Sequence, residues 1–163
     1  MSELLDRETL AAELHQSGTG HKAELRLWLR MLTCTTMIEA SIRSRLRKEF
    51  GVTLPRFDLM AQLQRAPGGM ILGDLSRRMM VSNGNVTGLI ERMVASGEVE
   101  RAPHETDGRA TVVRLTVAGR RRFDTMATAH GEWVAALFAG LPPGDLPVLM
   151  AALARVKHSV HLQ

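Results

Sequence analysis

The residues best suited to chemistry with another molecule lie in one short polar stretch, residues 82–88. An asparagine amide can bond the edge of adenine at two points, and a threonine methyl group can pack on thymine. Glycines at this place would let the backbone approach a duplex closely. We therefore predict a DNA-reading helix start, with contacts from Ser82, Asn83, Gly84, Asn85, Thr87 and Gly88. The alternative is an ordinary capped helix without a partner.

Basic residues flank this stretch. Arg77 and Arg78 precede it, and Arg92 follows it. Guanidinium groups placed beside a DNA-reading helix can neutralise phosphates, so we predict that these three arginines contact the DNA backbone.

A second candidate contact lies further along, where Asp107-Gly108-Arg109 separates two runs with the period of β-strands. An arginine at the tip of a hairpin can enter a narrow minor groove. A carboxylate two residues away can orient the guanidinium through a forked pair. We predict both roles for Arg109 and Asp107, and the alternative is a solvated turn.

Several amphipathic helices must position these residues. Residues 21–50 contain no Pro or Gly, and apolar or small side chains recur every three or four residues from Met31 through Cys34 to Leu46. Further helices are expected after Thr53, from Leu72 to Met79, after the capping Ser82, after the capping Thr116 and after Gly144. Between the fourth and the fifth helix, the period of two predicts a β-hairpin with a long charged tip.

This order of elements predicts a mainly α-helical fold with a small β-hairpin wing. We expect an N-terminal arm at residues 1–20, dimerisation helices at 21–50 and 117–163, and a winged helix-turn-helix lobe that binds DNA at 51–116. The terminal helices carry apolar stripes that lack an internal partner in so small a domain. Exposed stripes of that size favour an interface between two copies.

Residues from about 25 to 140 resemble the MarR family of winged-helix transcriptional regulators. The resemblance rests on an ordered set of motifs: Leu54-Pro55-Arg56-Phe57, Leu72-Gly73-Asp74-Leu75-Ser76-Arg77-Arg78-Met79, Val81-Ser82 with the following Asn-Val-Thr, Leu89-Ile90-Glu91-Arg92-Met93, Gly97-Glu98-Val99-Glu100-Arg101, and Asp107-Gly108-Arg109 leading to Val113-Arg114-Leu115-Thr116-Val117-Ala118-Gly119. It implies a homodimer whose lobes each read half of a pseudo-palindrome in double-stranded DNA. Wing motifs of the family often place a second basic residue where this chain has Gly108, which gives Arg109 more weight.

The resemblance also implies control by a small-molecule effector that releases a repressor from DNA. The family's pocket lies between the dimerisation helices and the winged lobe, where the candidate ligand-binding residues are Trp28, Leu32, Thr35, Arg43, Phe57 and Met60. Aromatic and Met residues at helical spacing belong more often to a core than to a pocket, so core packing is the alternative. The segment from Leu25 to Leu141 also resembles regulators of aromatic-acid catabolism, so we expect an aromatic acid or its aryl-CoA thioester.

Two other functions remain open. Cys34 could make the chain a redox-sensing repressor, but the peroxide sensors of this family hydrogen-bond their cysteine with tyrosines, and this chain has no Tyr. Because Cys34 falls on the apolar stripe of the first helix, where burial makes a thiol inert, we interpret it as core packing. The third possibility is a winged helix that binds only proteins, and DNA affinity that does not fall with salt would indicate it.

The composition of the chain argues against several other classes of protein. The chain has 163 residues, of which 45% are hydrophobic and 23% charged, and the net charge of +4 suits an acidic partner such as nucleic acid. A single cysteine excludes an internal disulfide, and no apolar run approaches the roughly 18 residues of a membrane span. We expect a cytoplasmic protein with no membrane association. His158 and His161 make a poor metal site, and phosphate-binding glycine loops and hydrolase motifs are missing, so we expect no metal, no cofactor and no enzymatic activity.

Overall fold

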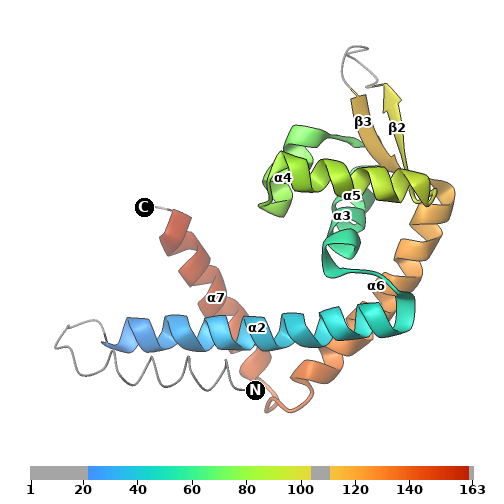
Figure 1. Ribbon diagram of the computed structural model, residues 1–163. Helices are drawn as coiled ribbons and strands as arrows, with labels where there is room; N and C mark the ends of the chain where they lie inside the picture. Colours follow the sequence, from blue (N-terminus) through green and yellow to red (C-terminus); the bar gives the residue numbers. More distant parts are fainter. Residues whose placement is uncertain (1–21, 104–110, 162–163) are drawn as a thin grey trace. The chain divides into compact units, whose positions relative to one another are not determined.

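The computed structural model describes residues 22–103 and 111–161, apart from the side chain of Asn83. The elements in chain order are α2 (Lys22–Phe50), α3 (Leu54–Gln64), β1 (Met70–Ile71), α4 (Leu72–Met79), α5 (Asn83–Ala95), β2 (Val99–Pro103), β3 (Thr111–Leu115), α6 (Val117–Phe138) and α7 (Asp145–His161) (Figure 1). The chain divides after Met126 into two compact units. The first holds α2 to β3 and the start of α6, and the second holds the rest of α6 and α7. Helices with one small antiparallel sheet confirm the predicted fold class.

The core of the first unit gathers apolar side chains from α2 to α6. Its fully buried members are Leu46, Val52, Leu59, Met60, Leu63, Leu75, Val86, Ile90, Met93, Val99 and Met126. The rings of Phe57 on α3 and Phe123 on α6 lie 5.4 Å apart between centroids. Such an aromatic pair adds about 0.5–1.5 kcal/mol beyond the burial of its area. This core holds the short helices around α5 in place.

The sheet has three strands in the order β1-β3-β2, all antiparallel. Val99 pairs with Leu115 and Pro103 with Thr111, which matches the predicted hairpin. The third strand, β1, was not predicted, because its two residues are too few to show a period. It pairs Met70 with Val113 immediately before α4 begins, and so it ties the helix-turn-helix to the wing.

The start of α6 is locked to the base of the wing. The Thr116 hydroxyl donates to the Gly97 carbonyl at 2.7 Å and accepts from the Gly119 N–H at 2.9 Å, so Thr116 caps the helix as predicted. The Thr116 N–H donates to the Glu98 carbonyl at 3.0 Å. A Cβ on Gly119 would lie 1.9 Å from that same carbonyl oxygen. Only glycine permits this approach of helix to strand.

Cys34 does not pack in the core, which corrects our interpretation of it. Only Ile42 and Leu46 are buried on α2, whereas Met31 and Ile38 are half-buried and Cys34 is exposed. The predicted stripe is therefore covered within the first unit only near its C-terminal end, where α2 contacts α3. The periodicity located the apolar face of α2. It could not show which part of that face other segments of the same chain cover.

In the second unit, α7 has no buried residue. Leu146, Leu149 and Leu153 recur at helical spacing and are 51%, 44% and 48% exposed. Val156 and Val160 continue the same stripe, and Val160 is also exposed. An apolar stripe of this length on a water-exposed helix is typical of an interaction surface.

The described residues lack two features that would indicate other functions. No helix in ranges 22–103 and 111–161 is long and apolar enough to cross a membrane. Within the same ranges, no cluster of three or more His, Cys, Asp or Glu side chains is arranged to hold a metal ion.

Candidate nucleic-acid interface

The turn that joins α4 to α5 is fixed by backbone hydrogen bonds. The Met80 N–H donates to the Arg77 carbonyl at 3.3 Å, and the Val81 N–H donates to the Ser76 carbonyl at 3.2 Å. Met80 is left-handed, with φ 55°, which completes a Schellman-type helix end. A non-glycine residue in this conformation costs about 1–2 kcal/mol. The turn therefore holds α5 at a set angle to α4.

The first turn of α5 is capped as predicted. Ser82 has extended backbone angles, and its side-chain oxygen accepts from the Asn85 N–H at 3.5 Å. A serine cap stabilises a helix by roughly 0.5–2 kcal/mol, and this long bond belongs at the weak end. The remaining N–H groups at the start of the helix give it a positive end that attracts anions.

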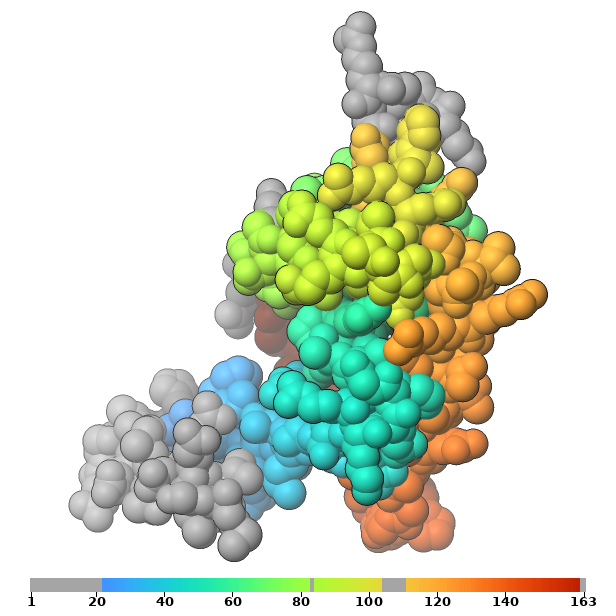
Figure 2. Space-filling model, turned by 45° about the vertical axis from the view of Figure 1, so that its right-hand side comes forward, coloured from blue at the N-terminus to red at the C-terminus, as the bar shows by residue number. Residues whose placement is uncertain are grey.

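The two sides of α5 differ in character. Its buried side consists of Val86, Leu89, Ile90 and Met93. Helical spacing places Gly84, Gly88 and Glu91 together on the opposite side, where Gly84 and Glu91 are exposed. A Cβ on Gly84 would meet nothing within 4 Å. Figure 2 shows this yellow-green helix as part of the open surface beside the wing strands.

The structure brings most of the predicted DNA contacts onto this surface. Ser82, Gly84, Asn85 and Arg92 are exposed, and Thr87 and Gly88 are half-buried. The backbone of Asn83 begins α5, but its side chain lies outside the described residues.

The two arginines of α4 lie in its last turn and are exposed. Arg77 forms an ion pair with Asp74 at 3.1 Å, yet its side chain is 78% exposed. An exposed pair of this kind is weak, so it leaves the guanidinium able to turn to a phosphate.

The body of the wing is described, but its tip is not. Glu100 on β2 lies opposite Arg114 on β3 in the antiparallel pair. Their side chains form an ion pair at 2.7 Å. Asp107 and Arg109 lie in 104–110, outside the described residues. Their roles therefore stay predictions.

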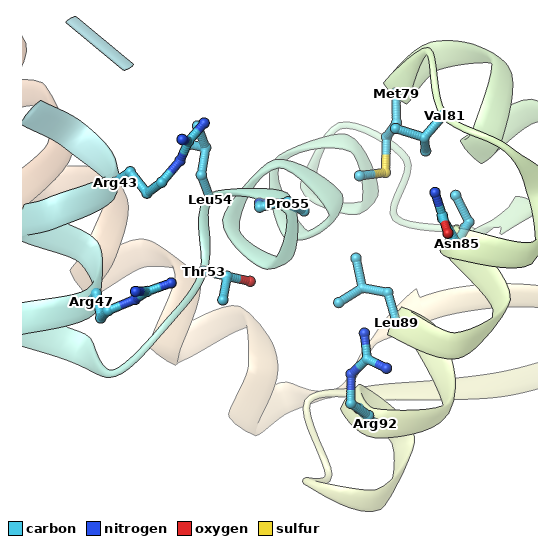
Figure 3. Close-up of a pocket in the computed structure, with 11 residues that line it drawn as sticks. Arg43, Arg47, Thr53, Leu54, Pro55, Met79, Val81, Asn85, Leu89 and Arg92 are labelled. Carbon is cyan, nitrogen blue, oxygen red and sulfur yellow. The ribbon is translucent and has the colours of Figure 1, made fainter. Parts of the chain in front are cut away.

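A pocket of about 470 Å³ lies beside α5 (Figure 3). It is lined by Arg43, Arg47, Thr53, Leu54, Pro55, Met79, Val81, Asn85, Val86, Leu89 and Arg92. These residues come from α2, the start of α3, the end of α4 with its turn, and α5. The lining combines guanidinium groups with apolar side chains.

Arg43 is the one predicted ligand-binding residue that lines this pocket. Phe57 and Met60 are buried in the core, where they are 6% and 0% exposed. Trp28 and Thr35 are exposed on α2, and Leu32 is half-buried there. The structure therefore does not gather the six residues into one site within the first unit.

Comparison with known proteins decides the family. A model of the MarR family matches residues 50–110. The crystal structure of a MarR family transcriptional regulator from Silicibacter pomeroyi superimposes with a TM-score of 0.75 at 32% identity, and the match covers 88% of this chain and 99% of that one. The chain belongs to the MarR family.

Curated relatives of this MarR-family chain agree. It is 30% identical over 125 residues to the uncharacterized HTH-type transcriptional regulator YkoM of Bacillus subtilis, a match that covers 76% of this chain and 79% of YkoM. It is 36% identical over 104 residues to the transcriptional activatory protein BadR of Rhodopseudomonas palustris, which covers 63% of this chain and only 59% of BadR. The similar proteins are transcriptional regulators, so this MarR-family chain is a DNA-binding regulator and not an enzyme.

One group that supports the interface of this MarR-family protein was missed by sequence reasoning. Glu98 is 3% exposed, and its Oε2 accepts from Nε of Arg56 at 2.6 Å. Its Oε1 lies 3.2 Å from Nη1 of Arg122, whose Nη2 donates to the Phe50 carbonyl at 3.1 Å. This cluster joins the base of the wing to α3, α6 and the end of α2. No local sequence pattern predicts a contact between residues so distant in sequence.

Proposed function

We propose that this chain acts as a homodimer that reads a pseudo-palindromic operator and is released from it by an aromatic acid or its CoA thioester. The observation that carries the DNA-binding part is the start of α5. It presents small and polar residues on an open, capped helix end, between the exposed arginines of α4 and Arg92. A major groove about 12 Å wide admits one such helix.

The contacts follow from side-chain chemistry. Asn85 would bond an adenine edge, and the Thr87 methyl group would pack on thymine. Arg77, Arg78 and Arg92 would neutralise phosphates, while Ser82, Asn83, Gly84 and Gly88 would allow or support close approach of the backbone. Arg109, oriented by Asp107, would enter the neighbouring minor groove.

The exposed apolar stripe of α7 supports the homodimer. Leu146, Leu149 and Leu153 would be covered by a second copy, together with the uncovered part of α2 that includes Trp28. A two-fold dimer places two recognition helices about one helical turn of DNA apart. Two half-sites at that spacing make the operator a pseudo-palindrome.

The experiment starts from selection of bound sequences out of random duplex DNA, followed by footprinting and sedimentation of the complex. We expect a palindromic consensus with half-site centres about 10 base pairs apart and two chains per duplex. Selection that returns no sequence preference, or one chain per duplex, would refute the proposal.

We propose further that the chain is a repressor, in which case a reporter placed behind the selected operator is silenced by the chain. Aromatic acids and aryl-CoA thioesters added to the purified complex should then release the DNA. The relative BadR is named a transcriptional activatory protein, so activation is the outcome to compare with repression. Activation of the reporter would overturn the repressor assignment but would leave the proposed DNA binding unaffected.

The exposure of Cys34 favours a second candidate trigger, oxidation of its thiol. A peroxide would take the thiolate to a sulfenic acid and leave as water or an alcohol. Hydrogen peroxide should then lower operator affinity in the wild type but not in Cys34→Ser. Equal responses of the two proteins would exclude this trigger.

A further inference from the structure

The open side of α5 carries very little side chain. Helical spacing puts Gly84, Gly88, Glu91 and Ala95 on one strip, opposite the buried side of the helix. Gly84, Glu91 and Ala95 are exposed, and Gly88 is half-buried. The two glycines have no side chain, and Ala95 has only a methyl group. Glu91 is therefore the one member of this strip whose side chain extends beyond Cβ.

The Glu91 carboxylate has no partner among residues 22–103 and 111–161. It takes part in none of the ion pairs between these residues. Neither Lys nor Arg stands three or four positions away from it on α5, where a helix neighbour could pair with it. A Cβ on Gly88 would have only Nη1 of Arg92 within 4 Å, at 3.6 Å. Because helical side chains lean toward the N-terminus, the carboxylate has room to extend over Gly88, toward the start of the helix.

The chemistry of an ionised carboxylate selects one base in the major groove. A carboxylate accepts hydrogen bonds and donates none. Guanine presents the acceptors N7 and O6 in this groove, thymine presents the acceptor O4, and adenine presents the acceptor N7 beside its N6 amine. Cytosine presents its N4 amine, which is a donor, and no acceptor. A carboxylate therefore matches cytosine, whereas an acceptor on each of the other three bases repels it.

We propose that Glu91 determines sequence specificity by accepting a hydrogen bond from the N4 amine of one cytosine in each half-site. This inference rests on the proposed function, in which the open side of α5 enters the major groove. Gly84 and Gly88 let the helix backbone come close to the base edges, so that the one long side chain of the strip reaches them. The carboxylate bonds to cytosine but opposes binding to every other sequence, so it increases discrimination rather than affinity.

The test compares the wild type with Glu91→Gln, which keeps the shape of the side chain and removes its charge. Bound sequences are selected from random duplex DNA with each protein, and affinities for the wild-type consensus and for random duplex are measured by competition. At one position of each half-site, we expect the wild type to select cytosine and the variant to select adenine, whose edge matches the Gln amide. The ratio of operator affinity to random-DNA affinity should fall at least about tenfold.

A change of the DNA alone gives a second measurement. Replacing the selected C·G pair by T·A should lower the affinity of the wild type about tenfold and should lower that of Glu91→Gln much less. Glu49→Gln is the matched control, because it removes the same charge from an exposed position on α2. It should change neither the consensus nor the ratio of affinities.

Two results would overturn the role of Glu91. One is an unchanged consensus with Glu91→Gln. The other is a rise in affinity by the same factor for operator and random DNA, because the carboxylate would then only repel phosphates. Both leave the proposed function intact, since the wild type still selects an operator. Failure of the wild type to select any sequence would refute the proposed function, and the role of Glu91 with it.

Discussion

Arg56 on α3 and Glu98 at the base of the wing are 42 residues apart in sequence, yet Nε of Arg56 donates to Oε2 of Glu98 at 2.6 Å. The Glu98 carboxylate is 4% exposed and also pairs with Arg122 on α6. Removing this carboxylate takes away the acceptor of both arginines, and a hydrogen bond to a charged group typically contributes about 1.5–3 kcal/mol. One carboxylate thus links the base of the wing to both α3 and α6.

We therefore expect Glu98→Ala to lower the free energy of unfolding in urea by about 1.5–3 kcal/mol. Glu100→Ala is the matched control, because Glu100 pairs with Arg114 across the same sheet but is 47% exposed. An exposed pair contributes about 0–1 kcal/mol. Similar losses in the two variants would show that the buried cluster has no special role.

Gly119 offers a second test of how the wing is held. Alanine there would place its Cβ 1.9 Å from the Glu98 carbonyl oxygen, so α6 must move away from the strand. We expect Gly119→Ala to lower the melting temperature clearly, by about 2–4 °C for each kcal/mol lost. Gly131→Ala, on the same helix with nothing within 4 Å of its Cβ, should raise stability by up to about 1 kcal/mol. A stabilising Gly119→Ala would contradict the observed packing.

Asp58 makes stability depend on pH. Its pKa is raised above the ordinary 3.8 because the surrounding protein removes water from the carboxyl, and because the charge of Glu39 repels it. The folded state therefore holds this proton more tightly than the unfolded state. The contribution of Asp58 to stability is fully present below pH 3.8 and is lost as the pH rises through the raised pKa.

It follows that Asp58→Asn should raise the melting temperature at a pH above the raised pKa, where the wild-type carboxyl is ionised. The gain should shrink as the pH is lowered toward 4, because the wild-type carboxyl is then increasingly protonated. Thermal unfolding of both proteins across this range measures the difference. A gain that is the same at every pH would argue against an effect of ionisation.

Much of the local structure around the candidate interface could be predicted because its signals are local. Ser82 as a cap, Leu72 to Met79 as a short helix and Thr116 as the next cap depend on neighbouring residues, and the structure places them as expected. The pairing of Val99 with Leu115 likewise follows from the two-residue period of the strands on either side of the hairpin tip. Propensity, capping and period all act within a few residues of the chain.

What the sequence could not show depends on contacts between distant segments. The strand β1 exists only because β3 lies beside it, and Glu98 is buried only because Arg56 and Arg122 reach it. The same applies to the pocket, where Arg47 and Arg92 belong to helices far apart in sequence. The prediction that Cys34 packs in the core was wrong for a related reason. An apolar stripe in the sequence does not show which of its residues other segments of the chain will cover.

Asn85 should determine which base sequence is bound. If its amide bonds an adenine edge, Asn85→Ala should lower affinity for the selected operator by about 1–3 kcal/mol and lower affinity for random DNA much less. Competition binding against both duplexes measures the ratio. Equal losses on the two duplexes would indicate that Asn85 contacts only phosphate.

We propose that the open side of α5 enters the DNA groove, and Gly84→Gln tests this contact most directly. The position has room for a side chain within the protein, so folding is preserved and helix propensity improves. Ala95→Gln adds comparable bulk to the exposed C-terminal end of the same helix as a control. We expect Gly84→Gln to keep or raise the melting temperature while lowering operator affinity at least about tenfold, with Ala95→Gln changing neither. Undiminished operator affinity of a folded Gly84→Gln protein would contradict the account.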